Sequence, residues 1–140
     1  MKILIAVDGS DISTRAVKFA IKLAGKLAEP PSITLAAVDP PLFPGAGRKL
    51  GAEAVRLYHD ENFERMLQPG RRLLERAGLA VTERNVIGEI APTLLELASK
   101  GRHQLIVMGS HGRGAVKELV LGSVSSKVLA QTTVPVTIVR

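Results

Sequence analysis

Apolar residues along the chain fall into five short runs, each of about the length of one β-strand. The runs cover Ile3–Val7, Ile33–Val38, Leu79–Ile87, Gln104–Met108 and Val134–Val139. Most of them are almost continuously apolar, which is typical of strands that are buried on both faces of a sheet. The third run is different because polar and apolar residues alternate in it, so we expect that strand to be half exposed and near an edge.

The segments between these runs carry apolar residues at helical spacing. They predict helices over Thr14–Ala28, residues 50–77, Ile90–Lys100 and Ser123–Gln131. Within the second helix, Pro69-Gly70 predicts a break or a kink, because proline removes a helical hydrogen bond. The prolines and glycines of Asp39–Lys49 predict a loop, and residues 39–51 form the one segment that we expect to be disorder-prone.

Strand and helix therefore alternate along the whole chain, with about 25–30 residues in each unit. This order predicts an α/β fold in which a mainly parallel, doubly wound sheet of five strands has helices on both faces. The length of 140 residues fits a single domain over residues 1–140, and it is sufficient for a buried core.

Composition excludes several classes of protein. Hydrophobic residues make up 46% and charged residues 23% of the chain, which is typical of a folded globular protein. Because there is no cysteine, disulfides, thiol nucleophiles and Cys-ligated metal sites are excluded. The three histidines do not have the spacing of a metal site.

We also expect a cytoplasmic protein with no membrane partner. No apolar run approaches the roughly 18 residues that a membrane-spanning helix needs. The first residues lead directly into the strand Ile3–Val7, without the pattern of a secretory signal.

The net charge of +6 is distributed unevenly, with +1 on residues 1–70 and +5 on residues 71–140. A basic domain raises the question of nucleic-acid binding. Aromatic residues make up only 3% of the chain, which leaves few side chains on which bases could stack. Nucleic acid is therefore an unlikely partner, and a small anionic ligand explains the basic half at least as well.

The richest candidate chemistry follows the fourth predicted strand. Residues 109–114 contain three glycines, and the segment leads through Leu121-Gly122-Ser123 into a helix. Glycines allow backbone N–H groups to approach phosphate oxygens and can adopt positive φ, and a helix N-terminus adds a favourable dipole. Ser123 and Ser125 would add hydroxyl groups, and Arg113 and Lys117 positive charge. The alternative is a flexible turn followed by a helix cap.

Three familiar phosphate-binding patterns are absent. A Walker A loop needs Gly-Lys followed by Ser or Thr, which this sequence does not contain. The dinucleotide pattern G-x-G-x-x-G would start at Gly112 and would require a glycine where Lys117 stands. A response-regulator site would need an acidic pair after the first strand, but Asp8 stands alone.

A different spacing is present: Gly109, two residues, Gly112, nine residues, Gly122 and Ser123. It resembles the G-2x-G-9x-G-S/T nucleotide signature of the ATP-binding branch of the universal stress protein family. The resemblance covers essentially the whole chain. The matching stretches are Ile3–Asp8, Leu105–Gly112, Leu121–Ser125 and Val134–Val136.

The resemblance implies the strand order 3-2-1-4-5, a fold like that of the adenine nucleotide alpha hydrolases, and ATP, with Mg²⁺, bound where strands one and four diverge. Asp8 would lie near the ribose and a divalent ion, and Ala37 would meet adenine through its backbone. The remaining implied contacts of adenosine are Ala6, Met108 and Gly109. Those of the phosphates are Gly112, Arg113, Gly122, Ser123, Val124 and Ser125.

Three of these positions have simpler explanations, which stay open at the level of sequence. Asp8 could cap the first helix, and Ser125 could act only in starting the last one. Met108 could be an ordinary core residue. His111, with no carboxylate partner nearby in the sequence, is expected to be a solvent-exposed loop residue.

The sequence offers no clear catalytic residue, because it has neither a phosphate-loop lysine nor an evident base. We therefore expect a nucleotide-dependent switch in stress response or signalling. The alternatives are a slow ATPase or phosphotransferase, and a dimeric interaction module without nucleotide. The apolar last strand, Val134–Val139, carries no charge before Arg140 and is expected to pair two copies into a homodimer.

Overall fold

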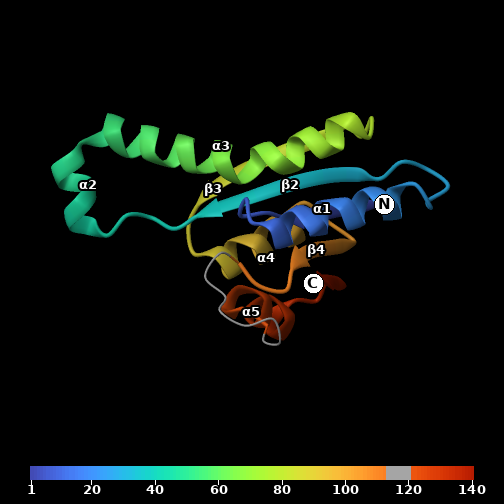
Figure 1. Cartoon of the computed structure of the whole chain (residues 1–140). Coiled ribbons are helices and arrows are strands. Elements are labelled where there is room, and N and C mark those ends of the chain that lie inside the picture. Colours follow the sequence, from blue (N-terminus) through green and yellow to red (C-terminus); the bar gives the residue numbers. More distant parts are fainter. Residues whose placement is uncertain (113–120) are drawn as a thin grey trace.

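Five parallel strands form a single sheet in the order β3-β2-β1-β4-β5 (Figure 1). The computed structural model describes residues 1–112 and 121–140. The strands are β1 (Lys2–Ala6), β2 (Ser32–Asp39), β3 (Val81–Ile87), β4 (Leu105–Gly109) and β5 (Val136–Val139). The predicted fold class and strand order are confirmed, and β3 is an edge strand as its alternation predicted.

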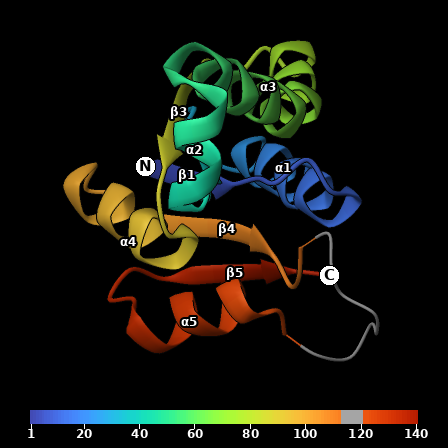
Figure 2. The same ribbon diagram turned by 90° about the vertical axis from the view of Figure 1, so that its left-hand side faces the viewer.

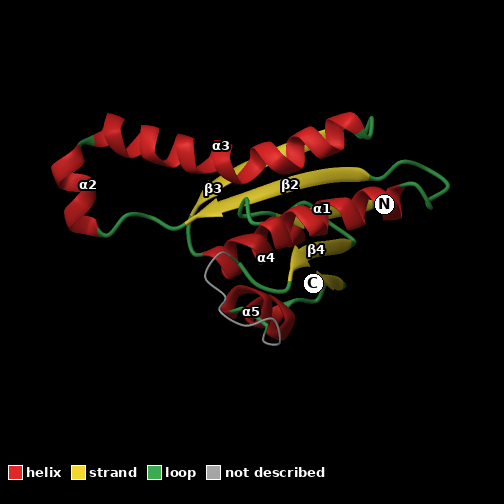
Figure 3. Ribbon diagram, in the orientation of Figure 1, coloured by secondary structure: helices red, strands yellow, loops and turns green. Residues whose placement is uncertain are grey.

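Helices cover both faces of this sheet, as expected for a doubly wound fold (Figures 2 and 3). They are α1 (Asp11–Ala24), α2 (Pro44–Leu50), α3 (Ala52–Arg76), α4 (Ile90–Lys100) and α5 (Ser123–Gln131). One face carries α1 and α3, and the other carries α4 and α5. Among the described residues, no helix is both long enough and apolar enough to cross a membrane.

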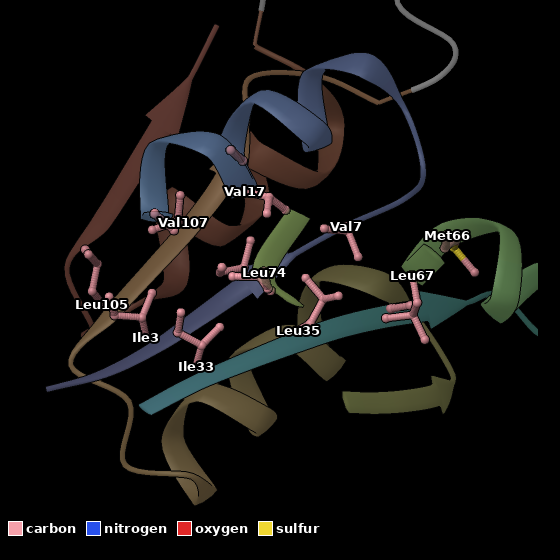
Figure 4. Close-up of a cluster of buried hydrophobic side chains, with 14 of the residues drawn as sticks. Ile3, Val7, Val17, Ile33, Leu35, Met66, Leu67, Leu74, Leu105 and Val107 are labelled. Carbon is pink, nitrogen blue, oxygen red and sulfur yellow. The ribbon is translucent and has the colours of Figure 1, made fainter. Parts of the chain in front are cut away.

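Alternation within the central strands divides the core into two layers. Ile3 and Ile33 point towards α1 and α3, where they pack with Val17 and Leu74 (Figure 4). Their neighbours along the strands point to the other face; Leu4, for example, joins the cluster beneath α4 and α5. Both sets are apolar because both faces are covered, which explains the continuous apolar runs in the sequence.

Two of the predicted features are wrong. Part of the predicted loop Asp39–Lys49 is helical, because Pro44 occupies the first turn of α2, where its missing N–H costs nothing. The predicted break at Pro69 does not occur either, and α3 continues through it. A Cβ atom at Gly70 would lie only 3.2 Å from a Val17 methyl group, so the helix packs tightly against α1 and the sheet at this point. Burial there offsets the hydrogen bond that proline removes.

Polar contacts fix α3 across the sheet at two places. At the carboxyl end of β2, the buried Asp39 carboxylate lies 2.6 Å from His59 Nδ1 and accepts a hydrogen bond from Asn62 at 2.9 Å. Further along, Arg71 binds Glu83 of β3 at 2.5 Å as well as Glu64 of its own helix. The two carboxylates raise the pKa of Arg71 above its ordinary value.

Candidate functional site

A cavity of about 370 Å³ opens at the carboxyl ends of β1 and β4. These strands lie side by side, but the chain leaves β1 towards α1 on one face and passes from β4 towards α5 on the other. The divergence leaves a crevice at this edge, which is where doubly wound sheets bind ligands. The volume lies within the range of about 300–1,000 Å³ that small-molecule sites occupy.

One wall of the cavity is apolar. It combines residues on the α4 face of the central strands with two residues of α4 itself. Its members are Ala6, Ala36, Val38, Ile90, Leu94 and Met108, and Val7, which follows β1 and packs on the α1 face, lines the cavity beside them. Such a wall, with a few polar groups opposite it, is suited to a flat, largely apolar ring.

The opposite wall is polar, and it starts with the turn between β1 and α1. The Asp8 carboxylate accepts a hydrogen bond from the N–H of Ser10 at 2.9 Å, and Gly9 between them has a φ of 77°. Ser10, whose Oγ accepts from the Ser13 N–H at 3.2 Å, is the N-cap of α1. The alternative that Asp8 caps this helix is therefore wrong, and Asp8 lines the cavity.

The three glycines of the predicted signature allow close approaches between segments. A Cβ atom at Gly109 would lie 2.5 Å from a methyl group of Ile12. One at Gly112 would lie 2.8 Å from the Asp8 carboxylate, and one at Gly122 would lie 3.0 Å from the Cα atom of His111. Among the described glycines, positive φ occurs only at positions 9, 51 and 78. Space, and not positive φ, therefore limits side chains at the signature positions, most strictly at Gly109 and less so at Gly112 and Gly122.

The N-terminus of α5 reaches the cavity with backbone N–H groups that have no partner among residues 1–112 and 121–140. Gly122 is its N-cap, and no side chain caps the first turn. The helical bonding starts with the Ser126 N–H, which donates to the Gly122 carbonyl at 3.0 Å. The N–H groups of the three residues between them, 123–125, have no partner within the helix, so this end carries a partial positive charge.

Ser125 has a structural role in addition to its place in the cavity wall. Its side chain is buried, and its hydroxyl donates to the Gly109 carbonyl at 2.9 Å. This bond joins α5 to the end of β4, which fixes the first turn of the helix beside the glycine loop. Ser123 lies two residues earlier in the same helix. It is exposed and lines the same cavity.

Nine of the predicted site residues line this cavity. They are Ala6, Asp8, Met108, Gly109, Gly112, Gly122, Ser123, Val124 and Ser125. Ala37 does not line it, because its side chain packs in the core on the α1 face, while its neighbours Ala36 and Val38 line the wall. Arg113 lies outside the described residues, as does Lys117.

Sequence reasoning missed the α4 part of the wall and misjudged His111. Ile90 and Leu94 are one helical turn apart, and this spacing could have indicated a shared face over the sheet. His111 was expected to be exposed, but it is partly buried and lines the cavity. Its Nδ1 atom lies 2.9 Å from the hydroxyl of Ser110, which follows β4 directly.

Comparison with known proteins agrees with the fold. The chain is 33% identical to the universal stress protein YxiE of Bacillus subtilis, over 99% of this chain and 98% of the relative. It superposes on the structure of MJ0577 from Methanocaldococcus jannaschii with a TM-score of 0.81 and 25% identity, covering 99% and 94% of the two chains. A universal stress protein solved in complex with cAMP is also 25% identical, with a TM-score of 0.72 and coverage of 100% and 97%. The family model of the universal stress proteins matches residues 1–140, and the chain belongs to that family.

Proposed function

We propose that this protein binds an adenine nucleotide, ATP together with Mg²⁺, in the cavity between β1 and β4, and acts as a nucleotide-dependent switch in stress response or signalling. One observation carries the proposal. An apolar wall stands opposite the free N–H groups of α5 and the glycine loop within one cavity of about 370 Å³. A ligand that joins a flat apolar ring to an anionic tail matches both walls.

The apolar wall is suited to adenine. Ala36 and Val38 lie on the α4 face of β2, and Ile90 and Leu94 face them from α4. The backbone of Ala37, between the first two, would form the hydrogen bonds that distinguish adenine from guanine. The structure of a related protein in complex with cAMP supports an adenine nucleotide as the kind of ligand.

The glycine loop and the N-terminus of α5 are suited to phosphates. Close packing at Gly112 and Gly122 keeps side chains out of the space in front of the free N–H groups. Those N–H groups and the helix dipole favour an anion. The exposed hydroxyl of Ser123 would add a hydrogen bond, and Arg113 would add positive charge.

The described residues fit Mg²⁺ only if the phosphates of the nucleotide bind the ion as well. Asp8 is the one carboxylate among the described residues that line the cavity, and these residues contain no cluster of three metal-ligating side chains. Mg²⁺ is typically held by one or two carboxylates together with the phosphates of its substrate. Bound in this way, the ion would neutralise phosphate charge, and Asp8 would orient the ribose end of the nucleotide.

Binding, and not catalysis, is the activity that these side chains support. His111 has its Nδ1 beside Ser110, and Asp8 accepts a backbone hydrogen bond. Among the described residues, no third group orients the His111 imidazole, as a base that activates a nucleophile would need, and the hydrogen bond of Asp8 is to backbone alone. A slow ATPase or phosphotransferase is the rival function, and single-turnover hydrolysis by the purified protein would reveal it.

Two measurements test the proposal. The purified protein is first denatured, and the released small molecules are identified by chromatography; we expect an adenine nucleotide. ATP with Mg²⁺ at 100 times its Kd should then stabilise the stripped protein by about 2.7 kcal/mol and raise Tm by roughly 6–12 °C, and GTP by much less. Equal shifts with every nucleoside triphosphate would show that only phosphates are bound. No release and no shift would favour the interaction module without nucleotide.

We also propose a homodimer formed by the C-terminal segment Val134–Val139. The carbonyls of Pro135 and Val139 accept hydrogen bonds from β4. Because successive residues of a strand point their backbone groups to opposite sides, Val136 and Ile138 direct theirs to the open edge. An antiparallel pairing of two such edges would satisfy them across a two-fold axis.

Light scattering tests the dimer, which should have a mass of about 30 kDa, twice the 14.9 kDa of the chain. Val136→Pro removes one outward N–H without removing a donor to β4, and it should shift the population towards monomer. Thr137→Val, at the residue whose backbone groups face β4, is the control and should stay dimeric. A monomeric wild type would refute the pairing.

A further inference from the structure

A second cavity, of about 330 Å³, lies at the opposite ends of the strands, where β1, β2 and β3 begin. It is next to the C-terminal end of α4. Three cationic residues line it, Lys2, Arg84 and Lys100. Ser32, Thr34 and Thr82 add hydroxyl groups, and none of the described residues in the wall carries a carboxylate. The cavity is separate from the candidate nucleotide site, because the two have no lining residue in common.

Strand register places these residues together. Thr34 of β2 is paired with Thr82 of β3, and Ser32 is paired with Lys2 of β1. Along β2 the intervening residues Ile33 and Leu35 point into the core on the other face. Buried parallel sheets are expected to be apolar on both faces, so the polar set on this face marks a part of the sheet that the helices do not cover.

The positive charge of this cavity is only partly neutralised. Lys100 forms an ion pair with Glu96 of the same helix. Lys2 Nζ lies 3.4 Å from the carbonyl oxygen of Gly101. Arg84 is exposed and forms no ion pair with any described residue. Three cations against one carboxylate leave a surplus of two positive charges around a concave surface.

His103 connects the hydroxyl groups to the end of α4. Its Nε2 lies 2.9 Å from the Thr34 hydroxyl, and its Nδ1 lies 3.4 Å from the carbonyl of Ala98. A carbonyl only accepts hydrogen bonds, so Nδ1 is the donor in the contact with Ala98, and Nε2 and the Thr34 hydroxyl are hydrogen-bond partners on the other side of the ring. The ring packs so closely on Gly101 that a Cβ atom there would collide with it. The imidazole is therefore held in place as part of the cavity wall.

We propose that this cavity is a second ligand site, for a small phosphorylated compound that carries more than one negative charge, such as a diphosphate. Guanidinium, ammonium and hydroxyl donors from three strands and one helix are the groups that bind phosphate oxygens by charge-assisted hydrogen bonds. A surplus of two charges matches a ligand that is at least doubly anionic. The concave shape and limited volume favour a small molecule over a polymer.

Inorganic pyrophosphate is the probe. Titrated into ¹⁵N-labelled protein, it should shift the backbone amides of Ser32 and Thr82, and calorimetry should give its Kd. Arg84→Gln with Lys100→Gln should weaken this binding by about 100-fold or more, since each lost charge-assisted bond is expected to raise Kd by about tenfold or more. Arg84→Gln alone should give an intermediate loss.

Lys18→Gln with Lys22→Gln is the matched control. It removes the same net charge from exposed positions on α1, on the other face of the sheet, and should change Kd by less than twofold. An equal loss of pyrophosphate affinity in both double variants would show that the affinity depends only on the overall charge of the protein. That result would overturn the proposal. The spectrum of each variant without ligand shows whether it is folded.

The position of the shifts separates this proposal from the first one. Pyrophosphate shifts confined to Gly109, Gly122 and Ser123 would overturn the second site and leave the nucleotide site standing. Shifts at Ser32 and Thr82 support the second site even if ATP fails to bind. A single-stranded oligonucleotide that binds here while pyrophosphate does not would also overturn the small-molecule proposal.

Discussion

The two cavities lie at opposite ends of the same strands and have similar volumes, about 370 and 330 Å³, but they are built from different chemical groups. At the carboxyl end, the polar wall is largely backbone: glycines at close-packed positions and the free N–H groups of α5. At the amino end, it consists of side chains such as Arg84 and Thr34. Binding by backbone N–H groups requires free space in front of them and a fixed geometry. Binding by side chains such as Arg84 depends on their charge. Substitutions should therefore affect the two cavities in different ways.

The largest difference is expected from Gly112→Val with Gly122→Val. Valine at Gly112 would press against the Asp8 carboxylate, and at Gly122 against the backbone of His111, so both would distort or fill the space proposed for phosphates. We expect the nucleotide stabilisation of about 2.7 kcal/mol at 100 times Kd to disappear. Thermal melts with and without ATP and Mg²⁺ measure this effect.

Pyrophosphate binding at the amino end should survive in the same double variant. Gly45→Val, at a position of α2 with nothing within 4 Å of the added Cβ atom, is the control and should keep the full nucleotide shift. If the double variant folds and also keeps the full shift, these glycines are only turn residues.

A second comparison uses one glycine from each end. Alanine at Gly109 would meet the Cγ2 methyl of Ile12, which is held by the stiff χ1 of a β-branched side chain. Overpacking of this kind costs about 1–3 kcal/mol, and we expect Gly109→Ala to lower the free energy of unfolding by about 2 kcal/mol. Chemical denaturation measures it. Adding Ile12→Ala should recover part of the loss, and independent effects of the two substitutions would contradict the proposed contact.

Gly101→Ala is the counterpart at the amino end and should cost less, about 1 kcal/mol. The added Cβ atom would meet the His103 ring, which can move by side-chain rotation, and the Leu97 carbonyl oxygen at 2.9 Å, which requires a small shift of the C-terminal end of α4. The variant should therefore lose the bond between His103 and Thr34, and with it part of the pyrophosphate affinity. A greater loss of stability than in Gly109→Ala would contradict the idea that the amino-end cavity tolerates change better.

The same contrast explains how much could be predicted from the sequence. Six of the nine predicted residues that line the carboxyl-end cavity lie within residues 109–125, where the short-range glycine spacing carried the family resemblance; Ala6, Asp8 and Met108 were predicted from that resemblance alone. Ala37, which was predicted to act through its backbone, does not line the cavity, whereas its neighbours Ala36 and Val38 do, because adjacent residues of a strand face opposite layers. The continuity of α3 through Pro69 could not be predicted either, since it depends on packing of Gly70 against a different helix. The amino-end cavity, finally, joins residues 2, 32, 82 and 100, whose proximity becomes visible only through strand register.

Two serines of α5 allow the structural and binding roles at the carboxyl end to be separated. Ser125→Ala removes a buried hydrogen bond to the Gly109 carbonyl and should lower the free energy of unfolding by about 1 kcal/mol. Ser123→Ala should leave unfolding almost unchanged and weaken ATP binding by about 1–2 kcal/mol, since the exposed hydroxyl is proposed to meet phosphate. Denaturation and ATP titration of both variants measure this. Ser126→Ala, at an exposed position of the same helix, is the control. If Ser123→Ala lowers stability as much as Ser125→Ala does, the assignment of roles is wrong.

The smallest effect is expected from Arg84→Gln on folding. Arg84 is exposed, and it has no ion pair among the described residues, so its removal breaks no interaction of the folded state. Exposed substitutions of this kind change stability by no more than about 0.5 kcal/mol. Because the chain has a net charge of +6 and Lys2 and Lys100 line the same cavity, relief of repulsion could make the change slightly stabilising. The free energy of unfolding should therefore stay level or rise by a few tenths of a kcal/mol in low salt, while pyrophosphate affinity falls. A clear loss of stability would show that Arg84 holds the sheet together and would remove the reason for treating it as a binding residue.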